Sequence, residues 1–208
     1  VRARVKAEDI GGPQAVDDIV AAWAFADADP YRAATHNKGI MNGVAAVALA
    51  FAQDHRAIEA GAHSYAARTG RDRSLSKWSK DENGDLVGEM TLPLAVGLVG
   101  GATRSHPVAQ VSRKILGVSK ASELAEVMGA VGLAQNLAAL RALSHEGIQK
   151  GHMKLHARNL ALQAGAEPHE VEEVVARMIG EGSLTASSAE DILRRMRDSD
   201  RHPSRKYN

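Results

Sequence analysis

A nearly uninterrupted apolar segment rich in alanine and glycine, residues 39–53, constrains the fold of this chain more than any other feature. We expect it to form a helix, and a helix that is apolar all round is buried on every side. Aromatic residues make up only 3% of the chain, so the surrounding core must consist of small aliphatic side chains that let helices approach closely. The sequence therefore predicts a helix-rich fold around a buried central helix.

The spacing of apolar residues places the other elements of the first part of the chain. Residues 1–6 alternate as in a strand, and Asn83-Gly84 is a strong turn signal between two further strands, residues 77–81 and 85–94. Asp29-Pro30 is expected to stop a helix and to be followed by a loop over 31–37. Ser119 or Ser122 is the expected N-cap of a long helix. Helices are predicted over residues 14–28, 54–67, 106–116 and 122–144, and in the first of them Val16, Ile19, Val20, Trp23 and Phe25 are mostly at helical spacing.

A polar break over residues 146–151 separates this part from a small helical unit with helices at 152–163, 168–179 and 186–197. The expected fold class is α+β and helix-rich, with a small sheet. We expect two domains, residues 1–146 and residues 147–208, the second an all-helical flap that moves about the break.

Composition excludes several classes of protein. With 26 basic and 25 acidic residues the net charge is +1, so no basic excess indicates a nucleic-acid partner. There is no cysteine, which excludes disulfides, a cysteine nucleophile and thiolate metal sites, and fits a cytoplasmic protein. No apolar run approaches membrane-spanning length and no signal peptide is recognisable, so we expect no membrane association. The missing initiator methionine suggests a start within a longer protein.

Lys38 is the first candidate for chemistry, because the predicted helix would place it in the first turn. Both the positive helix end and burial disfavour a cation there, so a lysine at that position is a candidate functional residue. The alternative from spacing alone is that Lys38 points to solvent and Asn37 caps the helix. Asp54, in the segment Gln53–Arg56, is a second candidate, and its alternative is simply to cap the next helix.

His152 and His156 are four residues apart and so share one face of a helix. No glutamate follows the first histidine and no third ligand is evident, so a metal site is not expected. A histidine next to a hinge suits a mobile general acid, since its pKa lies near neutrality. The alternative is a pair of surface histidines. The glycine-rich run Gly97–Gly101 matches no nucleotide-binding fingerprint and is read as a structural turn.

Together and in this order, five segments resemble class II hydroxymethylglutaryl-CoA reductases, and the resemblance covers nearly the whole chain. The stretches around Lys38 and His152 are the most specific. The segments are Pro30–Gly43, Asp54–His63, Pro93–Thr103, Val131–Asn136 and Glu146–Asn159.

The resemblance implies a four-electron reduction of 3-hydroxy-3-methylglutaryl-CoA to mevalonate and CoA with NADH or NADPH, in a homodimer or a higher oligomer of dimers, with no metal. It also implies a role for each matching residue. The implied catalytic residues are Lys38, Asp54 and His152; Arg32 would hold the substrate carboxylate, Asn42 would orient the lysine, and Gln135, Leu143 and His156 would contact CoA.

The family's catalytic glutamate, its Glu-Asn-Val-Ile-Gly-type substrate motif and its nucleotide-binding domain are absent from this sequence. We therefore expect the C-terminal half of a longer enzyme, either as a fragment or as one of two pieces, with the N-terminal half as a partner and as the holder of the cofactor. One alternative is a non-catalytic fragment that only dimerises or binds CoA. Another is a different CoA-dependent enzyme that uses the lysine and histidine without hydride transfer.

Lys38 and Asp54 are 16 residues apart, which is roughly 24 Å along a straight helix. A hydrogen bond needs about 3 Å. Either the helix breaks, with Gly43 the only glycine inside it, or Asp54 of one subunit meets Lys38 of another across a two-fold axis. The second possibility is preferred, with the apolar helix as the dimer core.

Overall fold

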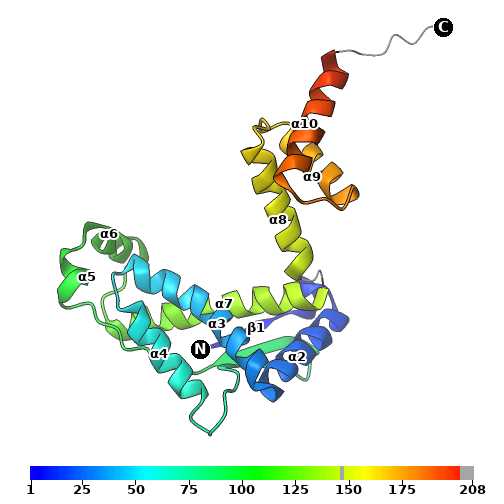
Figure 1. The fold of residues 1–208 in the computed structure, drawn as a ribbon. Helices are drawn as coiled ribbons and strands as arrows, with labels where there is room; N and C mark the ends of the chain where they lie inside the picture. Colours follow the sequence, from blue (N-terminus) through cyan, green and yellow to red (C-terminus); the bar gives the residue numbers. More distant parts are fainter. Residues whose placement is uncertain (146–147, 202–208) are drawn as a thin grey trace. The chain divides into compact units, whose positions relative to one another are not determined.

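The structure is a computed structural model that describes residues 1–145 and 148–201, and only the backbone at residues 145, 148–152 and 199–201. The chain divides into two compact units, Val1–His145 and Glu146–Asn208. The first unit combines helices with a small antiparallel sheet, and the regular structure in the described residues of the second unit is helical (Figure 1). The predicted helix-rich α+β class is confirmed.

The sheet has three strands, β1 (Arg2–Val5), β2 (Ser76–Lys80) and β3 (Leu86–Met90), in the order β1-β3-β2 with both pairs antiparallel. The predicted first strand and the hairpin are therefore confirmed. The expected strand over 85–94 is too long, because the ladder ends where Met90 pairs with Val1 and the ring of Pro93 follows, without an N–H to donate.

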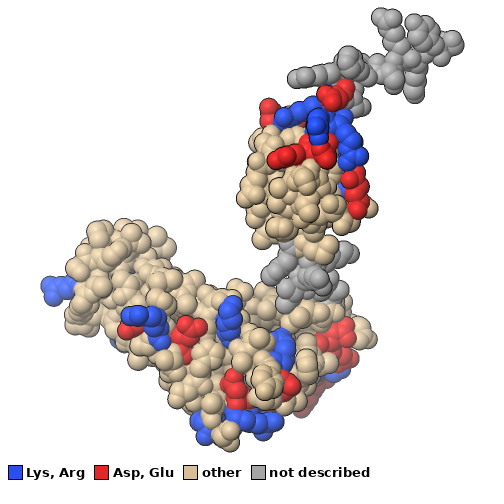
Figure 2. Space-filling view, viewed as in Figure 1, with Lys and Arg blue, Asp and Glu red and all other residues tan. Residues whose placement is uncertain are grey.

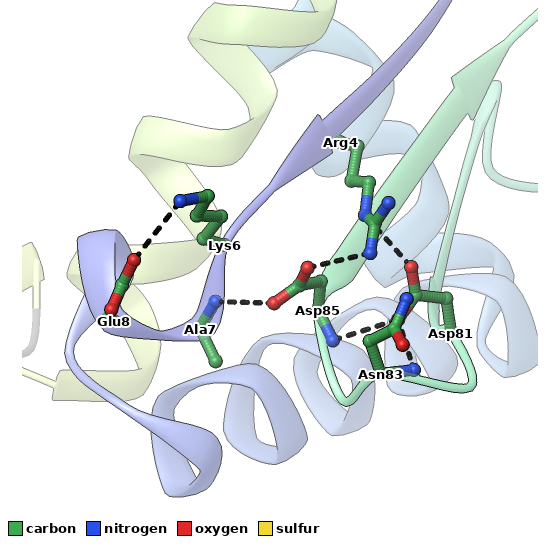
Figure 3. A network of polar contacts seen from close by, with 7 residues as sticks. All are labelled: Arg4, Lys6, Ala7, Glu8, Asp81, Asn83 and Asp85. Atoms are coloured by element: carbon green, nitrogen blue, oxygen red, sulfur yellow. Dashed lines mark hydrogen bonds and ion pairs between the residues drawn. The ribbon is translucent and has the colours of Figure 1, made fainter.

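Arg4 ties the first strand to the hairpin turn by contacts with two carboxylates (Figure 3). Its guanidinium lies 2.9 Å from Asp81 and donates to Asp85 at the same distance. The other oxygen of Asp85 accepts from the Ala7 N–H, at 3.0 Å, and that hydrogen bond is the main cause that lowers the pKa of Asp85. Gly84 takes the left-handed conformation the turn requires, with φ 84°. The hairpin turn predicted from the sequence thus also anchors the N-terminal strand.

Three long helices lie beside the sheet in the first unit (Figure 1). The longest of them, α7 (Ala121–His145), contacts both of the others, which are α2 (Pro13–Ala28) and α3 (Pro30–Ala50). Their buried apolar side chains join those of the strands in one core, with Trp78, Phe51, Ile19 and Ile40 among the largest. The helices are α1 (Ala7–Ile10), α2 (Pro13–Ala28), α3 (Pro30–Ala50), α4 (His55–Ala66), α5 (Gly101–Ser105), α6 (Pro107–Leu116) and α7 (Ala121–His145).

The predicted loop over 31–37 is wrong, because those residues form the first two turns of α3. Asp29 caps this helix by accepting from the Arg32 N–H at 2.8 Å, and Pro30 occupies the first position. Proline lacks an N–H and has a helical φ, so it starts a helix as readily as it ends one. The helix also ends earlier than expected, at Ala50.

The expectation that this helix is buried on every side is also wrong. One face packs against α7 and carries fully buried residues such as Ala33, Ile40 and Val44. The opposite face is exposed along its whole length, with Tyr31 at 85% and Leu49 at 61% exposure. We call it the open face; spaced three or four residues apart, its members are Tyr31, Ala34, Thr35, Lys38, Asn42, Ala46 and Leu49.

Helix α7 begins at Ala121, so neither Ser119 nor Ser122 is its N-cap in the expected sense. The carboxylate of Glu123 instead accepts from the backbone N–H groups of Ser119 and Lys120, at 2.7 and 3.1 Å. A glutamate three residues into a helix can satisfy these orphan donors in place of a serine hydroxyl. The main cause of the lowered pKa of Glu123 is the hydrogen bond from Ser119 N–H.

The second unit contains α8 (Ile148–Gln163), α9 (Val171–Gly180) and α10 (Ala186–Arg201) around its own apolar core. Part of the predicted break at 146–151 lies outside the described residues, and the rest is wrong because α8 already starts at Ile148. Arg197 on α10 donates two hydrogen bonds to Glu170, and this lowers the pKa of Glu170 to about 2. The same guanidinium also donates to the Gly165 carbonyl.

Cationic and anionic side chains lie interspersed on the face of each unit shown in Figure 2. The lobe formed by α5 and α6 is mostly uncharged on that face. None of the helices in the described part of the chain combines the length and the apolar character needed to cross a bilayer.

Trp78 and Gly88 face each other across the β2–β3 pair, and the indole covers the glycine. A Cβ added at Gly88 would lie 2.4 to 2.8 Å from three ring atoms, far inside van der Waals contact. Trp78 is 1% exposed and its indole N–H donates to Asn136 at 2.7 Å. The ring therefore has no free space into which it can move.

We predict that Gly88→Ala destabilises the first unit by about 1–3 kcal/mol, the usual cost of overpacking a core. Urea unfolding followed by tryptophan fluorescence measures this. Gly39→Ala is the matched control, because an added Cβ there meets nothing within 4 Å. Inside a helix that change is expected to stabilise by roughly 0.5–1 kcal/mol. Equal effects of the two substitutions would contradict the predicted crowding at Trp78.

Candidate active site

Lys38 lies on the open face of α3, in the third turn rather than the first, and its side chain is exposed. The expectation of a buried cation at a helix start is therefore wrong, and the solvent-facing alternative describes this single chain. Asn37 is not a cap. It is fully buried, donates to the Arg73 carbonyl at 2.7 Å and accepts from the Leu75 N–H at 2.9 Å.

His36 stands on the opposite side of the helix from Lys38, at the centre of a buried polar cluster. Its Nε2 is hydrogen-bonded to the hydroxyls of Ser74 and Ser76, both at 2.9 Å, and lies 3.2 Å from the amide nitrogen of Asn136. Asn136 in turn accepts from the Ser76 hydroxyl at 2.8 Å. This cluster joins α3, β2 and α7, and so it determines which face of α3 is presented to solvent.

The pKa of His36 is lowered to about 4, mainly because burial disfavours the charged imidazolium and next because the Arg32 cation is close. His36 is therefore neutral at physiological pH. A neutral ring can share hydrogen bonds with its neighbours in the core without the cost of a buried charge.

Arg32 and Leu143, which come from α3 and α7, line one surface cavity of about 410 Å³. The guanidinium donates to the Thr35 hydroxyl at 3.0 Å, and no ion pair to it is found within the described part of the chain. Partial burial lowers the pKa of Arg32, which nevertheless stays charged at neutral pH. The cavity offers a cation beside an apolar wall, a combination that suits a ligand with a carboxylate and an apolar part.

Phe25 also lines this cavity. Phe25 is 61% exposed, whereas Val16 and Ile19 on the same helix are fully buried. Val16, Ile19, Val20 and Trp23 follow helical spacing, and Phe25 does not fit that series, which was the signal available. Asp18 and Ser144 complete the polar part of the lining and were not singled out from the sequence.

Asn42 and Gln135 are both exposed, on α3 and α7 respectively. The two helices approach closely at Gly43, where an added Cβ would lie 3.0 Å from the Gln135 Cβ and from the Val131 carbonyl oxygen. Gln135 therefore borders the open face next to Asn42. Asn42 lies one helical turn after Lys38 on the open face.

Asp54 lies beyond the other end of α3 and caps α4, where its Oδ1 accepts from the Ala57 N–H at 3.1 Å. Capping, the alternative considered for Asp54, is thus observed. Helix α3 runs through Gly43 without a break, so the option of a break there is wrong. The Gln53 N–H donates to the Ala48 carbonyl, which leaves Asp54 near Ala48, roughly 15 Å along the axis from Lys38. No ion pair joins Lys38 and Asp54 within the chain.

His152 and His156 belong to α8 in the second unit. The side chain of His156 is exposed, and the side chain of His152 lies outside the described residues. Across residues 1–145 and 148–201, no three histidine, aspartate or glutamate side chains are grouped as they would be around a metal ion.

Comparison with protein families identifies this arrangement. The family model described as hydroxymethylglutaryl-coenzyme A reductase matches residues 1–157. The chain belongs to the hydroxymethylglutaryl-CoA reductase family. The matched residues include Lys38, Asp54 and His152. Lys38 and Asp54 belong to the first unit and His152 to the second.

Two curated relatives carry the same name. The 3-hydroxy-3-methylglutaryl-coenzyme A reductase of Archaeoglobus fulgidus is 55% identical over 199 residues, covering 94% of this chain and 45% of that protein. A probable 3-hydroxy-3-methylglutaryl-coenzyme A reductase of Borreliella burgdorferi is 47% identical over 129 residues, covering 62% and 30%. The chain thus spans less than half the length of the curated relatives it matches.

Solved structures of the Streptococcus pneumoniae reductase share the fold. A class II reductase from that organism, bound to NADPH in open conformations, is 46% identical with a TM-score of 0.68 and is matched over 94% of this chain and 49% of its own. A second structure is 45% identical with a TM-score of 0.69, matched over 94% and 48%. The reductase fold of the family is therefore retained in this chain.

We predict that this chain loses stability as the pH falls from 6.5 towards 4. The folded-state pKa of His36 is depressed, so its stabilisation is fully present above the unfolded-state pKa of 6.5 and is lost as the pH falls through about 4. The loss amounts to up to about 3 kcal/mol, from 1.36 kcal/mol per pKa unit. Urea unfolding at a series of pH values measures it.

His36→Gln should flatten this pH dependence, although it lowers stability at neutral pH. His106→Gln is the control, since His106 is exposed, and it should leave the slope unchanged. A slope that persists in the His36 variant would assign it to other groups.

Proposed function

We propose that this chain provides catalytic residues of a hydroxymethylglutaryl-CoA reductase. The complete enzyme would interconvert 3-hydroxy-3-methylglutaryl-CoA with mevalonate and CoA by two reductions that use NADH or NADPH. The observation that carries the proposal is the family match over residues 1–157. The name of the archaeal relative, which is 55% identical, supports it. By complete reductase we mean this chain together with the polypeptide that supplies the rest of the relatives' length.

Lys38 is proposed as the group that stabilises the oxyanion. When a thioester carbonyl is reduced, negative charge develops on its oxygen, and a fixed ammonium nearby lowers the energy of that state. Lys38 is exposed on the open face of the single chain, so its ammonium can take part in a site formed at that face.

His152 and Asp54 are proposed to handle the protons of the reaction. The CoA thiolate needs a proton as it leaves, and a histidine with a pKa near neutrality can donate one. A carboxylate close to the lysine favours its charged form, which is the role proposed for Asp54. One oxygen of Asp54 is used in capping α4, and no partner is described for the other.

Substrate binding is proposed for the residues that surround the open face and the neighbouring cavity. Arg32 would pair with the carboxylate of the substrate, and the apolar wall at Leu143 would contact the CoA chain. Asn42 would hold the lysine in place. Gln135 and His156 are the remaining proposed contacts to CoA.

The described residues do not fit the nicotinamide cofactor. Their sheet is antiparallel and three-stranded, whereas dinucleotide sites are typically built on parallel βαβ units. We therefore propose that the cofactor is held by the other half of the complete reductase.

A second subunit is proposed to complete the site. Lys38 and Asp54 lie far apart within one chain, and the open face of α3 exposes apolar side chains such as Tyr31 and Leu49. A two-fold contact along that face would bury them and create two equivalent sites at once, each with Lys38 from one subunit and Asp54 from the other. Dimers, or oligomers of dimers, are the proposed assembly.

The alternative function is a non-catalytic fragment that dimerises or binds CoA. It is favoured by one observation, that the chain spans only 45% of the archaeal relative. A complete reductase that binds the CoA substrate but oxidises no nicotinamide would support this alternative, or another CoA-dependent reaction without hydride transfer.

We predict that Lys38→Ala in the complete reductase lowers turnover by on the order of a hundredfold or more, because an oxyanion-stabilising group is lost. CoA binding should remain largely intact. Nicotinamide oxidation measured by absorbance, together with calorimetric titration of CoA, tests both parts. Lys77→Ala is the control, an exposed lysine on β2 that should keep wild-type turnover. Near wild-type turnover of the Lys38 variant would refute the assignment.

Subunit mixing tests the shared site. Lys38→Ala and Asp54→Ala reductases, each inactive alone, are combined and allowed to exchange subunits. At equal amounts half the dimers are mixed and each has one intact site, so we expect about a quarter of wild-type activity. If native mass spectrometry detects mixed dimers and activity stays at zero, the two residues do not meet across the interface.

A further inference from the structure

The side chain of Gln53 connects three separate segments next to Asp54. The two N–H groups on its Nε2 are shared among three acceptors, the Gly97 carbonyl at 2.9 Å, the Thr103 hydroxyl oxygen at 2.7 Å and the Phe51 carbonyl at 3.1 Å. Its Oε1 accepts from the Gly97 N–H at 2.9 Å. One carboxamide thus holds the end of α3, the glycine-rich run Gly97–Gly101 and the start of α5.

These contacts use both ends of the amide, and therefore they depend on the amide itself rather than on side-chain bulk. Gly97 is held through both its N–H and its carbonyl, which fixes the orientation of that peptide as well as its position. Thr103 is buried, with 7% exposure, so its hydroxyl would lose a needed partner if Gln53 were absent.

The backbone around Gln53 is constrained in the same place. Ala52 has a φ of 51° and is the only residue other than glycine with a positive φ in the described chain. A residue with a Cβ adopts this conformation only when its surroundings favour it. The Gln53 N–H donates to the Ala48 carbonyl at 2.8 Å, and its side chain bonds Phe51, so both contacts support the reversal that leads into Asp54.

We propose that Gln53 is a positioning residue that holds Asp54 and the Gly97–Gly101 run in one fixed arrangement at the reaction site. The inference rests on the proposed catalytic role of Asp54. The Gln53 contacts hold the backbone that precedes Asp54, and the Ala57 N–H donates to one oxygen of its carboxylate. The other oxygen is the one proposed to meet a lysine. Proton transfer and charge stabilisation require that meeting to be accurate, and a displacement of about 1 Å can cost about a hundredfold in rate.

The test is Gln53→Met in the complete reductase, a change that keeps the length of the side chain and removes every hydrogen bond that the side chain makes. We expect kcat to fall by about tenfold to a hundredfold, with KM for the CoA substrate within about threefold of wild type. Gln53→Glu, which keeps the acceptor towards Gly97 but loses the donors, should lower kcat likewise. Rates are normalised to the folded fraction from thermal melting.

Gln110→Met is the matched control. Gln110 is exposed on α6 and donates one hydrogen bond to the Arg104 carbonyl at 2.7 Å, without contact to Asp54. It should keep wild-type kcat. A Gln53→Met enzyme whose melting temperature falls while kcat per folded molecule stays within about twofold of wild type would overturn the proposal, and so would a rise in KM alone.

Two further variants separate the possible failures. Asp54→Asn should abolish turnover; if it does not, the proposed function of this site is wrong, whereas loss in Asp54→Asn without loss in Gln53→Met overturns only the role of Gln53. If Gln53→Met fails to fold, Thr103→Val decides, because it removes a single partner of the amide. A threefold or greater loss of kcat in the folded Thr103 variant, roughly what one weakened hydrogen bond gives, supports the proposal, and an unchanged kcat overturns it.

Discussion

The side chains of His36, Ser76 and Asn136 meet in the buried space between α3, β2 and α7, and the orientation of α3 depends on that meeting. His36 and Asn136 are 100 residues apart in sequence. Leaving any of these polar groups unpaired would cost about 1–3 kcal/mol, so the three elements can come together in few other registers. Because burial keeps the imidazole neutral, the cluster has no net charge to desolvate.

The consequence for function follows from helix geometry. Successive residues turn by about 100° around an α-helix, so Lys38, two residues after His36, points to the opposite side. A helix locked by His36 on its inner face therefore carries Lys38 and Asn42 outward along the open face. The same short motif thus supplies both the structural anchor and the proposed oxyanion group, with each residue's role decided by its side of the helix.

At the C-terminal end of α3, the turn at Phe51–Asp54 also combines structural contacts with a proposed catalytic residue. Asp54 caps α4 with one oxygen, which is an ordinary structural task, and the cap also orients the carboxylate. Gln53 fixes the turn on its other side by bonding Gly97 and Thr103. Since α3 is continuous between Lys38 and this turn, its length keeps the two proposed catalytic groups apart in one chain. This separation is the reason for the proposal that two subunits share the site.

Local signals in the sequence were sufficient for many elements of the fold. Asn83-Gly84 predicted the hairpin because few dipeptides tolerate its backbone angles. Capping by Asp54, which the sequence offered as the alternative to a catalytic role, was visible because a carboxylate before a helix satisfies free N–H groups. The motifs around Lys38 and His152 identified the family. In each case the determining interaction lies within a few residues, so its signature is visible in the sequence itself.

Tertiary structure alone decided which face of α3 is buried and where Arg32, Phe25 and Leu143 form a cavity. Alanine and glycine are accommodated both in cores and on surfaces, so a helix made of them has no hydrophobic side that sequence could reveal. The contact between Asn136 on α7 and His36 on α3 decides which face of the helix is buried and which is exposed. The sequence determined which chemical groups are present, and packing against residues a hundred positions away determined where they point.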